Sequence, residues 1–197
     1  MANQTTIADP ITLKGVGIHT GVEVTMTFKP AGANHGYAFQ RTDLEGSPII
    51  EALANNVADT KRGTSLQKNG VTIHTCEHVL AAFVGSEVDN VLIELNASET
   101  PIMDGSSKFF VEAIEKVGIK TLDAERDEYI VKENITYTDE ESGSEITLLP
   151  AEDYEVTTMV DFGTKVLGTQ NATLKKLSQF KKEFADARTF SFLHEIE

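Results

Sequence analysis

The sequence is nearly devoid of cysteine and has no long apolar run. Cys76 is the single cysteine among 197 residues, which excludes a disulfide framework and suits a reducing compartment. No apolar stretch approaches the roughly 18 residues of a membrane span, and the first nine residues lack the apolar core of a signal peptide. We therefore expect a soluble, cytoplasmic protein that would meet any membrane-derived substrate from the cytosolic side.

Basic residues are also scarce. Lysine and arginine number 17 against 31 aspartates and glutamates, for a formal net charge of −14. Such a charge disfavours an unaided surface for nucleic acid or for an anionic membrane, so we expect no nucleic-acid partner. The hydrophobic fraction of 40% is enough for one good core or two small ones.

The most informative stretch is residues 71–85, VTIHTCEHVLAAFVG. Apolar and polar residues alternate up to Ile73 as in a strand, and the period then becomes helical. The helical spacing is set by Val79, Leu80, Ala82 and Phe83. Thr75 is a plausible N-cap and Gly85 a natural residue after the helix end. A strand therefore passes into a helix whose first turn carries Glu77 and His78, where the helix dipole favours a neutral, metal-binding imidazole.

Three interpretations of this stretch compete. H-T-C-E-H matches the H-x-x-E-H motif of inverted zinc peptidases, which requires His74 and His78 on one continuous helix. The strand-like alternation and the cap at Thr75 argue against that geometry. The second interpretation keeps His78 as a zinc ligand and Glu77 as a general base, with the other ligands elsewhere. The third is a capping-type glutamate beside a histidine with a purely structural role.

Further elements follow from periodicity and turn signals. The expected strands cover residues 11–14, 22–28, 36–41, 64–73 (two strands around a turn) and 90–95, and a helix is expected over residues 108–117. The Asn69-Gly70 pair is a strong signal for a two-residue hairpin turn. The buried stripe of the helix is expected to contain Phe110, Ala113, Ile114 and Val117, and Gly118 should end it.

Two loop residues could serve the same site. His19 lies in a glycine-rich turn, where backbone can approach a ligand, although isolated turn histidines are more often structural. Asp104 lies in the loop before the helix at 108–117. It could orient a metal ligand, or it could simply accept hydrogen bonds from its own backbone.

A second unit is expected to begin at Glu128, after a charged linker at 122–127. Its expected strands cover 129–137, 145–149 and 154–160, followed by a loop at 166–170 and a helix that starts near Phe192 and Ile196. M-T-F-K-P-A at 26–31 is echoed by I-T-L-L-P-A at 146–151, which suggests a duplication. We thus expect an α+β protein of two similar sheet-plus-helix-pair units, with the helices packed between the sheets. Residues 1–122 form the first unit and residues 128–197 an incomplete second one.

Six motifs occur in the order and spacing of one enzyme family. They are G-V-G-I-H-T-G at 15–21, T-x-x-x-T at 60–64, T-x-E-H-x-x-A-A at 75–82, D-N at 89–90, P-I-M-D-G-S at 101–106 and A-R-T-F at 187–190. The chain resembles the UDP-3-O-acyl-N-acetylglucosamine deacetylases of lipid A biosynthesis, which are zinc hydrolases of Gram-negative bacteria. Lys61 and Arg62 depart from the apolar residues that relatives often carry there; they either face solvent or contact the substrate's diphosphate.

The resemblance implies a mechanism and a set of site residues. His78 would bind Zn²⁺, Glu77 would act as general base, and the hydroxyl of Thr189 would stabilise the oxyanion. Phe190 would wall the sugar pocket, and His19, Thr60 and Thr64 would line the site, with Asp104 supporting a ligand. The family's other two ligands come from a later H-x-x-x-D motif, which these 197 residues lack. The chain is therefore expected to be an inactive fragment, and a non-catalytic ligand-binding or assembly fragment is the alternative.

Overall fold

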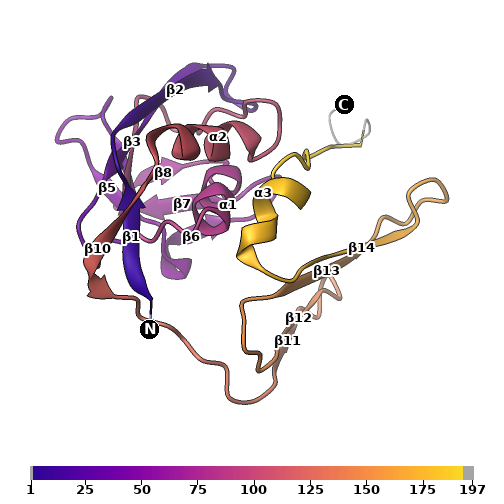
Figure 1. Ribbon diagram of the computed structural model, residues 1–197. Coiled ribbons are helices and arrows are strands. Elements are labelled where there is room, and N and C mark those ends of the chain that lie inside the picture. The colour runs from indigo at the N-terminus through magenta and orange to yellow at the C-terminus, as the bar shows by residue number, and fades with distance from the viewer. Residues whose placement is uncertain (1, 193–197) are drawn as a thin grey trace.

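A five-stranded mixed sheet organises the first part of the chain. The computed structural model describes residues 2–192 (Figure 1). The strand order is β2 (Ile11–Val16), β3 (Glu23–Pro30), β9 (Val91–Leu95), β4 (Tyr37–Arg41) and β5 (Ile49–Glu51). Neighbouring strands are antiparallel except β4 and β9, which are parallel. Together with the helices, this sheet confirms the expected α+β class.

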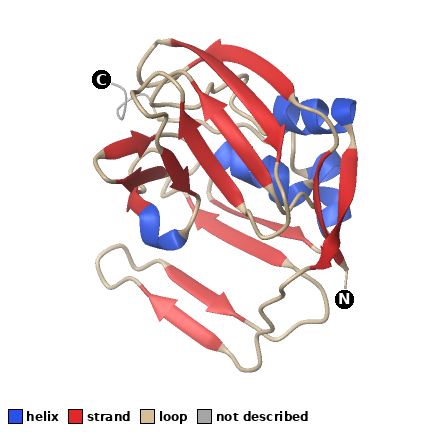
Figure 2. Ribbon diagram, turned by 90° about the vertical axis from the view of Figure 1, so that its left-hand side faces the viewer, coloured by secondary structure: helices blue, strands red, loops and turns tan. Residues whose placement is uncertain are grey.

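Two helices cover one face of this sheet and close the core. They are α1 (Glu77–Gly85) and α2 (Lys108–Val117) (Figure 2). The alternation expected over residues 22–28 is confirmed for Val24, Met26 and Phe28, which are buried, whereas Val22 lies before β3 and is 49% exposed. Phe28 meets Phe83 of α1 edge-to-face at 4.7 Å between ring centroids and Phe110 of α2 at 6.4 Å. Each such buried ring stabilises the fold by about 1.5–3 kcal/mol.

A small three-stranded sheet leads into α1. It comprises β6 (Val57–Asp59), β7 (Ser65–Lys68) and β8 (Val71–Ile73), and the single-turn 3₁₀ helix η1 (Ala54–Asn56) precedes it. The expected hairpin at 64–73 is confirmed. Asn69 and Gly70 both have positive φ angles, 52° and 79°, as a two-residue turn between antiparallel strands requires.

The expected linker at 122–127 is wrong for most of its length. Residues 119–125 form strand β10 (Ile119–Glu125), which pairs antiparallel with β1 (Asn3–Ile7). Arg126 then donates a hydrogen bond to Asp89 at 3.0 Å. Most side chains of β10 are exposed, so it lacks the apolar alternation that marks a half-buried strand. The chain leaves the first part only after this pairing.

The next segment consists of two hairpins. They are β11 (Ile135–Thr138) with β12 (Glu145–Leu148), and β13 (Val156–Asp161) with β14 (Thr169–Leu174). The expected strands are present but shorter. Strand β14 differs from the expected loop at 166–170, because its sequence TQNAT offers no apolar alternation that would predict a strand. No residue from 127 to 173, all of which the structure describes, is buried.

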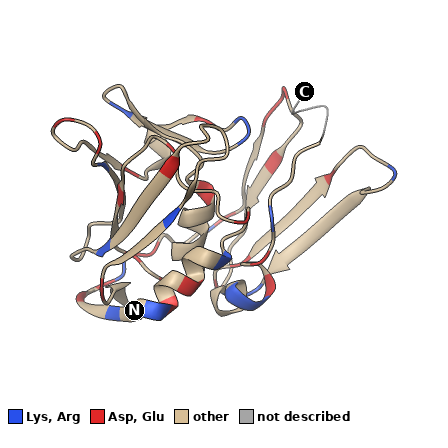
Figure 3. Ribbon diagram, turned by 90° about the horizontal axis from the view of Figure 1, so that it is seen from above, with Lys and Arg blue, Asp and Glu red and all other residues tan. Residues whose placement is uncertain are grey.

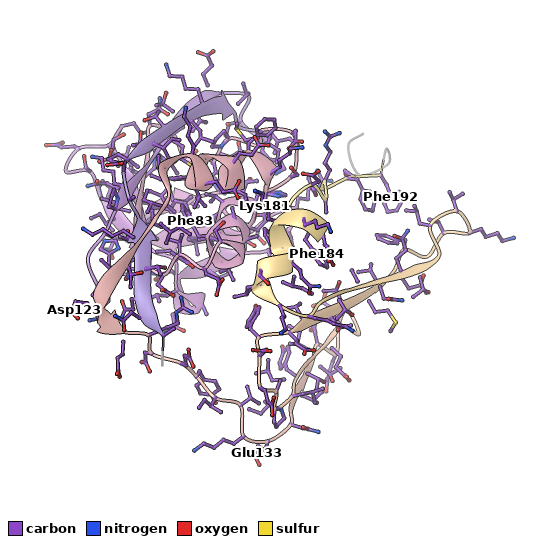
Figure 4. The ribbon with its side chains drawn as sticks, in the orientation of Figure 1. Phe83, Asp123, Glu133, Lys181, Phe184 and Phe192 are labelled. Carbon is purple, nitrogen blue, oxygen red and sulfur yellow. The ribbon has the colours of Figure 1, made fainter. Side chains whose placement is uncertain are left out.

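Figure 4 illustrates the contrast between the two parts of the molecule. Phe83 lies deep among the side chains of the first part, whereas Glu133 points away from the molecule beside β11. The helix expected around Phe192 and Ile196 falls mainly on residues beyond 192, which lie outside the described part.

A short helical segment returns the chain to the first part. η2 (Leu177–Gln179) and α3 (Phe180–Glu183) lie beside α1 and α2, and α3 carries both basic and acidic residues (Figure 3). Phe180 packs so closely on α1 that a Cβ added at Gly85 would lie 2.1 Å from its Cδ1. Lys181 pairs with Glu115 of α2. Within residues 2–192, no helix is both long and apolar enough to cross a membrane.

Candidate active site

The junction between β8 and α1 is sharply kinked. Thr75 has a φ of 60°, a left-handed conformation that is rare for a β-branched residue. Cys76, not Thr75, is the N-cap of α1, so the expected cap is wrong. The Thr75 hydroxyl instead donates a hydrogen bond to Glu99 Oε1 at 3.1 Å. The kink ends the strand-like backbone and starts the helix within one residue.

This kink excludes the inverted zinc-peptidase geometry. His74 lies in a parallel β-bridge with Glu99, while His78 is the second residue of α1. The H-x-x-E-H motif needs both histidines on one helix. The ring of His74 meets Ser65 instead, with 2.9 Å between Nδ1 and Oγ.

Glu77 and His78 lie side by side in the first turn of α1, as expected. Glu77 Oε1 is 3.7 Å from Nε2 of His78, and the other Glu77 oxygen accepts a hydrogen bond from the N–H of Thr64 at 2.9 Å. The side chains are 37% and 15% exposed, so the ring is largely enclosed while the carboxylate is partly open. Gly63 allows the loop to approach, since a Cβ there would be 3.2 Å from Glu77 Oε1.

The thiol of Cys76 is not a competing reactive group. Burial, together with the charge of Glu77, raises the pKa of Cys76 to about 12. The neutral thiol also lies 3.3 Å from the carbonyl oxygen of Thr64. Nucleophiles and metal ligands are thiolates, so Cys76 has a packing role.

Glu99 was missed by sequence reasoning. It lies in the loop after β9 and is fully buried. Its Oε1 accepts hydrogen bonds from the N–H of His19 and the hydroxyl of Thr75, and its Oε2 accepts from the N–H and hydroxyl of Thr20. Burial alone would raise the pKa of Glu99, but these hydrogen bonds outweigh it and hold the pKa below its ordinary value. An acidic residue between a buried strand and Thr-Pro was the available signal.

A cavity of about 460 Å³ opens beside this junction. It is lined by residues of the β2–β3 turn, the 59–63 loop, β7 and the end of β8, among them His19, Arg62, Gly63, His74 and Glu99. His19 therefore lines the same cavity as Gly63, whereas Glu77 and His78 are not among its lining residues. Thr64 reaches Glu77 through its backbone, whereas Thr60 is exposed.

The loop before α2 connects Thr189 to the helix that carries His78. The N–H of Thr189 donates to the carbonyl of Gly105 at 2.8 Å. Two residues further on, the hydroxyl of Ser107 donates to the backbone carbonyl of His78 at 2.9 Å. Thr189 and His78 are thus held by the same short loop, although they are 111 positions apart in the sequence.

Asp104 accepts hydrogen bonds within its own turn and also forms an ion pair with Arg188, the residue before Thr189. One carboxylate oxygen accepts hydrogen bonds from the N–H and hydroxyl of Ser106, and the other pairs with the guanidinium of Arg188 at 3.1 Å. The hydrogen bonds from Ser106, and then those from Arg188, lower the pKa of Asp104. Phe190 is 57% exposed and stacks against Phe162 near the end of β13, with 5.3 Å between ring centroids.

The side chains at the start of α1 provide only part of a metal site. Among residues 2–192, no group of three or more histidine, cysteine, aspartate or glutamate side chains is close enough to hold a metal ion. His78 offers one imidazole with a carboxylate beside it, which is one of the protein ligands that a catalytic zinc takes.

Comparison with known proteins gives a consistent result over the whole chain. A family model described as UDP-3-O-acyl N-acetylglycosamine deacetylase matches residues 4–197. The bifunctional enzyme LpxC/FabZ of Bacteroides thetaiotaomicron is 46% identical over 197 residues, which are 100% of this chain and 43% of the relative. UDP-3-O-acyl-N-acetylglucosamine deacetylases of Geotalea uraniireducens and Hahella chejuensis are 38% and 41% identical, over 100% of this chain and 64% and 66% of those relatives. The chain spans about half to two thirds of the length of these curated relatives.

Proposed function

The chain belongs to the UDP-3-O-acyl N-acetylglycosamine deacetylase family, and we propose that the protein carrying it removes the N-acetyl group from UDP-3-O-acyl-N-acetylglucosamine. The reaction is the zinc-dependent hydrolysis of an amide in lipid A biosynthesis. The observation that carries the proposal is the Glu77–His78 pair at the start of α1, with the carboxylate held by the Thr64 N–H beside a cavity. The soluble substrate headgroup would be met in the cytoplasm, and the acyl chain ties the reaction to membrane-directed lipid precursors.

His78 would supply one ligand to Zn²⁺. Bound zinc lowers the pKa of a coordinated water from about 15.7 to about 7 and polarises the substrate carbonyl. The 3.7 Å separation from Glu77 is too long for a hydrogen bond, so the carboxylate does not occupy Nε2 of His78. The side chain of His78 is only 15% exposed, so little bulk water reaches its ring.

Glu77 would take the proton from the attacking water. Its carboxylate is already oriented by the hydrogen bond from the Thr64 N–H, and the side chain is 37% exposed, so water can reach it. A positioned general base typically contributes 10²–10⁴-fold to the rate.

Residues around this pair would bind the substrate. The hydroxyl of Thr189 would donate to the oxyanion that forms on the acetyl carbonyl, and loss of one such donor usually costs about 10²–10³ in kcat. Phe190 would wall the sugar pocket, while His19, Thr60 and Thr64 would line it. Asp104 would act on the Thr189 segment through Arg188, because the side-chain hydrogen bonds that it accepts come from Ser106 and Arg188.

The remaining metal ligands would come from the part of the protein that this chain does not span. The relatives extend well beyond the aligned region, which leaves room for a second unit to be completed. We propose that residues 128–197 begin this second unit, similar in design to residues 1–122. On this account the 197-residue chain by itself has half a metal site and no deacetylase activity.

A second candidate is a non-catalytic binding or assembly role for the chain, favoured by the exposure of both faces of the β11–β14 hairpins. Metal analysis and an activity assay separate the two candidates. The deacetylase proposal expects one zinc per molecule and turnover for the protein that includes the downstream region, and neither for residues 1–197 alone. Full-length protein that binds no zinc and releases no acetate would support the binding role. Stoichiometric zinc on residues 1–197 would contradict the one-ligand account.

A further inference from the structure

The carboxylate of Glu99 joins two segments that lie far apart in the sequence. From one side it accepts hydrogen bonds from His19 and Thr20 of the β2–β3 turn, at 3.0 Å, 2.9 Å and 2.8 Å. From the other side it accepts the hydroxyl of Thr75 at 3.1 Å. Both oxygens are fully used, and the side chain has no exposed surface. These four donors fix the orientation of the buried carboxylate.

The β2–β3 turn packs directly against the Glu99 carboxylate. A Cβ added at Gly17 would lie 2.4 Å from Glu99 Oε2 and 2.5 Å from the hydroxyl of Thr20. Backbone hydrogen bonds of Gly17 with Gly21 and with Val22 close the turn at 2.9 Å and 3.0 Å. Only a residue without a side chain therefore lets the turn close on the carboxylate.

The other end of the contact is the kink that starts α1. Thr75 adopts its left-handed conformation two residues before Glu77. Its hydroxyl is held by Glu99, and its carbonyl accepts a hydrogen bond from the hydroxyl of Thr100, the next residue after Glu99. Residues 99 and 100 thus hold the side chain and the backbone of Thr75 together. Strained backbone of this kind persists only where the surroundings hold it in place.

We propose that Glu99 is a positioning residue, which sets the place of His19 relative to the first turn of α1 by tying the β2–β3 turn to Thr75. His19 and Gly63 line the same cavity, and the N–H of Thr64, the next residue, donates a hydrogen bond to Glu77. The contacts of Glu99 therefore set how the β2–β3 turn lies relative to the start of α1. The inference rests on the proposed function for its kinetic consequence and on the described contacts for its structural one. A misplacement of about 1 Å at a reacting centre can cost about 10²-fold in rate.

The kinetic experiment uses the whole protein, including its downstream region. Glu99→Gln keeps the shape of the side chain but places an amide N–H among N–H and O–H donors. We expect kcat to fall about 10–100-fold, with unchanged zinc content. The decisive readout is a double-mutant cycle with His19→Ala, because Glu99 acts through the turn that carries His19. In the His19→Ala background Glu99→Gln should lower kcat by less than about 3-fold, and a fully additive loss would overturn the inference.

Thr6→Val provides a matched control for loss of a buried hydrogen bond. Thr6 is 2% exposed, and its hydroxyl bonds Asn90 and Ala31 away from the cavity. This variant should lower the melting temperature and leave kcat of the folded protein unchanged. If Glu99→Gln does not fold, Thr20→Val, which keeps the carboxylate and removes one donor, takes its place in the cycle.

A second measurement separates this inference from the proposed function. In residues 1–197, the His19 and Thr20 amides should exchange at least about 10-fold faster in Glu99→Gln than in the unmodified chain, while amides of β3 keep their rates. Unchanged protection at both amides would overturn the inference whatever the activity of the protein. If the amides respond and the whole protein shows no deacetylation, the proposed function fails and the structural role of Glu99 stands.

Discussion

Oε1 of Glu77 lies 3.7 Å from Nε2 of His78, while the second Glu77 oxygen is fixed by the backbone N–H of Thr64. The two groups are adjacent but not hydrogen-bonded to each other, as their proposed roles of metal ligand and general base require. Their separation is set by backbone, because both residues belong to the first turn of α1 and the loop at 63–64 presses on that turn.

Gly63→Ala should weaken catalysis more than stability. The new Cβ would lie 3.2 Å from Glu77 Oε1, so the carboxylate must shift by a few tenths of an ångström. We expect kcat of the whole protein to fall about 10-fold, in line with the sensitivity of catalysis to small displacements. Gly143→Ala is the control: Gly143 also has a positive φ, 70°, but meets nothing within 4 Å. Both variants place alanine at a positive φ, 150° at Gly63 and 70° at Gly143, so each should lose more than about 1 kcal/mol of stability from backbone strain. Equal kcat values would argue against a positioned Glu77.

Gly85→Ala should detach α3 from α1. Alanine usually stabilises a helix by about 1 kcal/mol relative to glycine, yet here its Cβ would lie 2.1 Å from Phe180 Cδ1. The ring must move, so we expect a lower melting temperature and faster amide exchange over residues 177–185. The double variant Gly85→Ala/Phe180→Ala should be no less stable than Phe180→Ala alone. A stabilised single variant would show that Phe180 does not pack there.

Acid should destabilise the chain partly through Glu99. Its pKa is held below the ordinary value of 4.5 by the hydrogen bonds it accepts. The folded state therefore binds this proton less readily than the unfolded state, and the resulting stability is fully present above about pH 4.5 and is lost as the pH falls through the lowered pKa. Urea unfolding from pH 7 to pH 3 should show a smaller pH dependence for Glu99→Gln. Parallel curves for the two proteins would contradict this assignment.

Arg188→Gln should loosen the Thr189 segment with little cost in stability. The side chain of Arg188 is 68% exposed, and an exposed ion pair contributes about 0–1 kcal/mol. Loss of the contact with Asp104 should nevertheless lower kcat several-fold, because Thr189 follows directly. Lys29→Gln, which breaks the exposed pair with Glu94 on the sheet, is the matched control and should leave kcat unchanged. A similar kcat for both variants would contradict a role of Arg188 in positioning Thr189.

Local patterns predicted those elements that bury an apolar face. The alternation of β3, the Asn69-Gly70 turn and the stripe of α2 each specify their structure within a few residues. In α2, Phe110, Ala113 and Ile114 are buried as expected, whereas Val117 is only partly buried and Val111 is buried as well. The pairing of β1 with β10 was not predictable in this way, because β10 is mostly exposed and the paired residues lie more than 110 positions apart.

The candidate site was predictable only where residues adjacent in the sequence carry it. Glu77 and His78 follow from one strand-to-helix transition. The role of Glu99 depends on three segments that meet in the folded chain, and its place between a buried strand and Thr-Pro does not by itself predict those contacts. Thr75 illustrates the same limit: a threonine before a helix is normally a cap, but a nearby buried carboxylate takes its hydroxyl here.

The most direct test replaces Glu77 by glutamine in the whole protein and measures zinc content together with acetate release from UDP-3-O-acyl-N-acetylglucosamine. Glutamine can still accept the hydrogen bond from Thr64 but cannot take a proton from water. We expect zinc to stay at the level of the unmodified protein while kcat falls by at least about 10²-fold. Turnover at the unmodified rate would contradict the assignment of Glu77 as the base, and loss of zinc would show that Glu77 belongs to the ligand set instead.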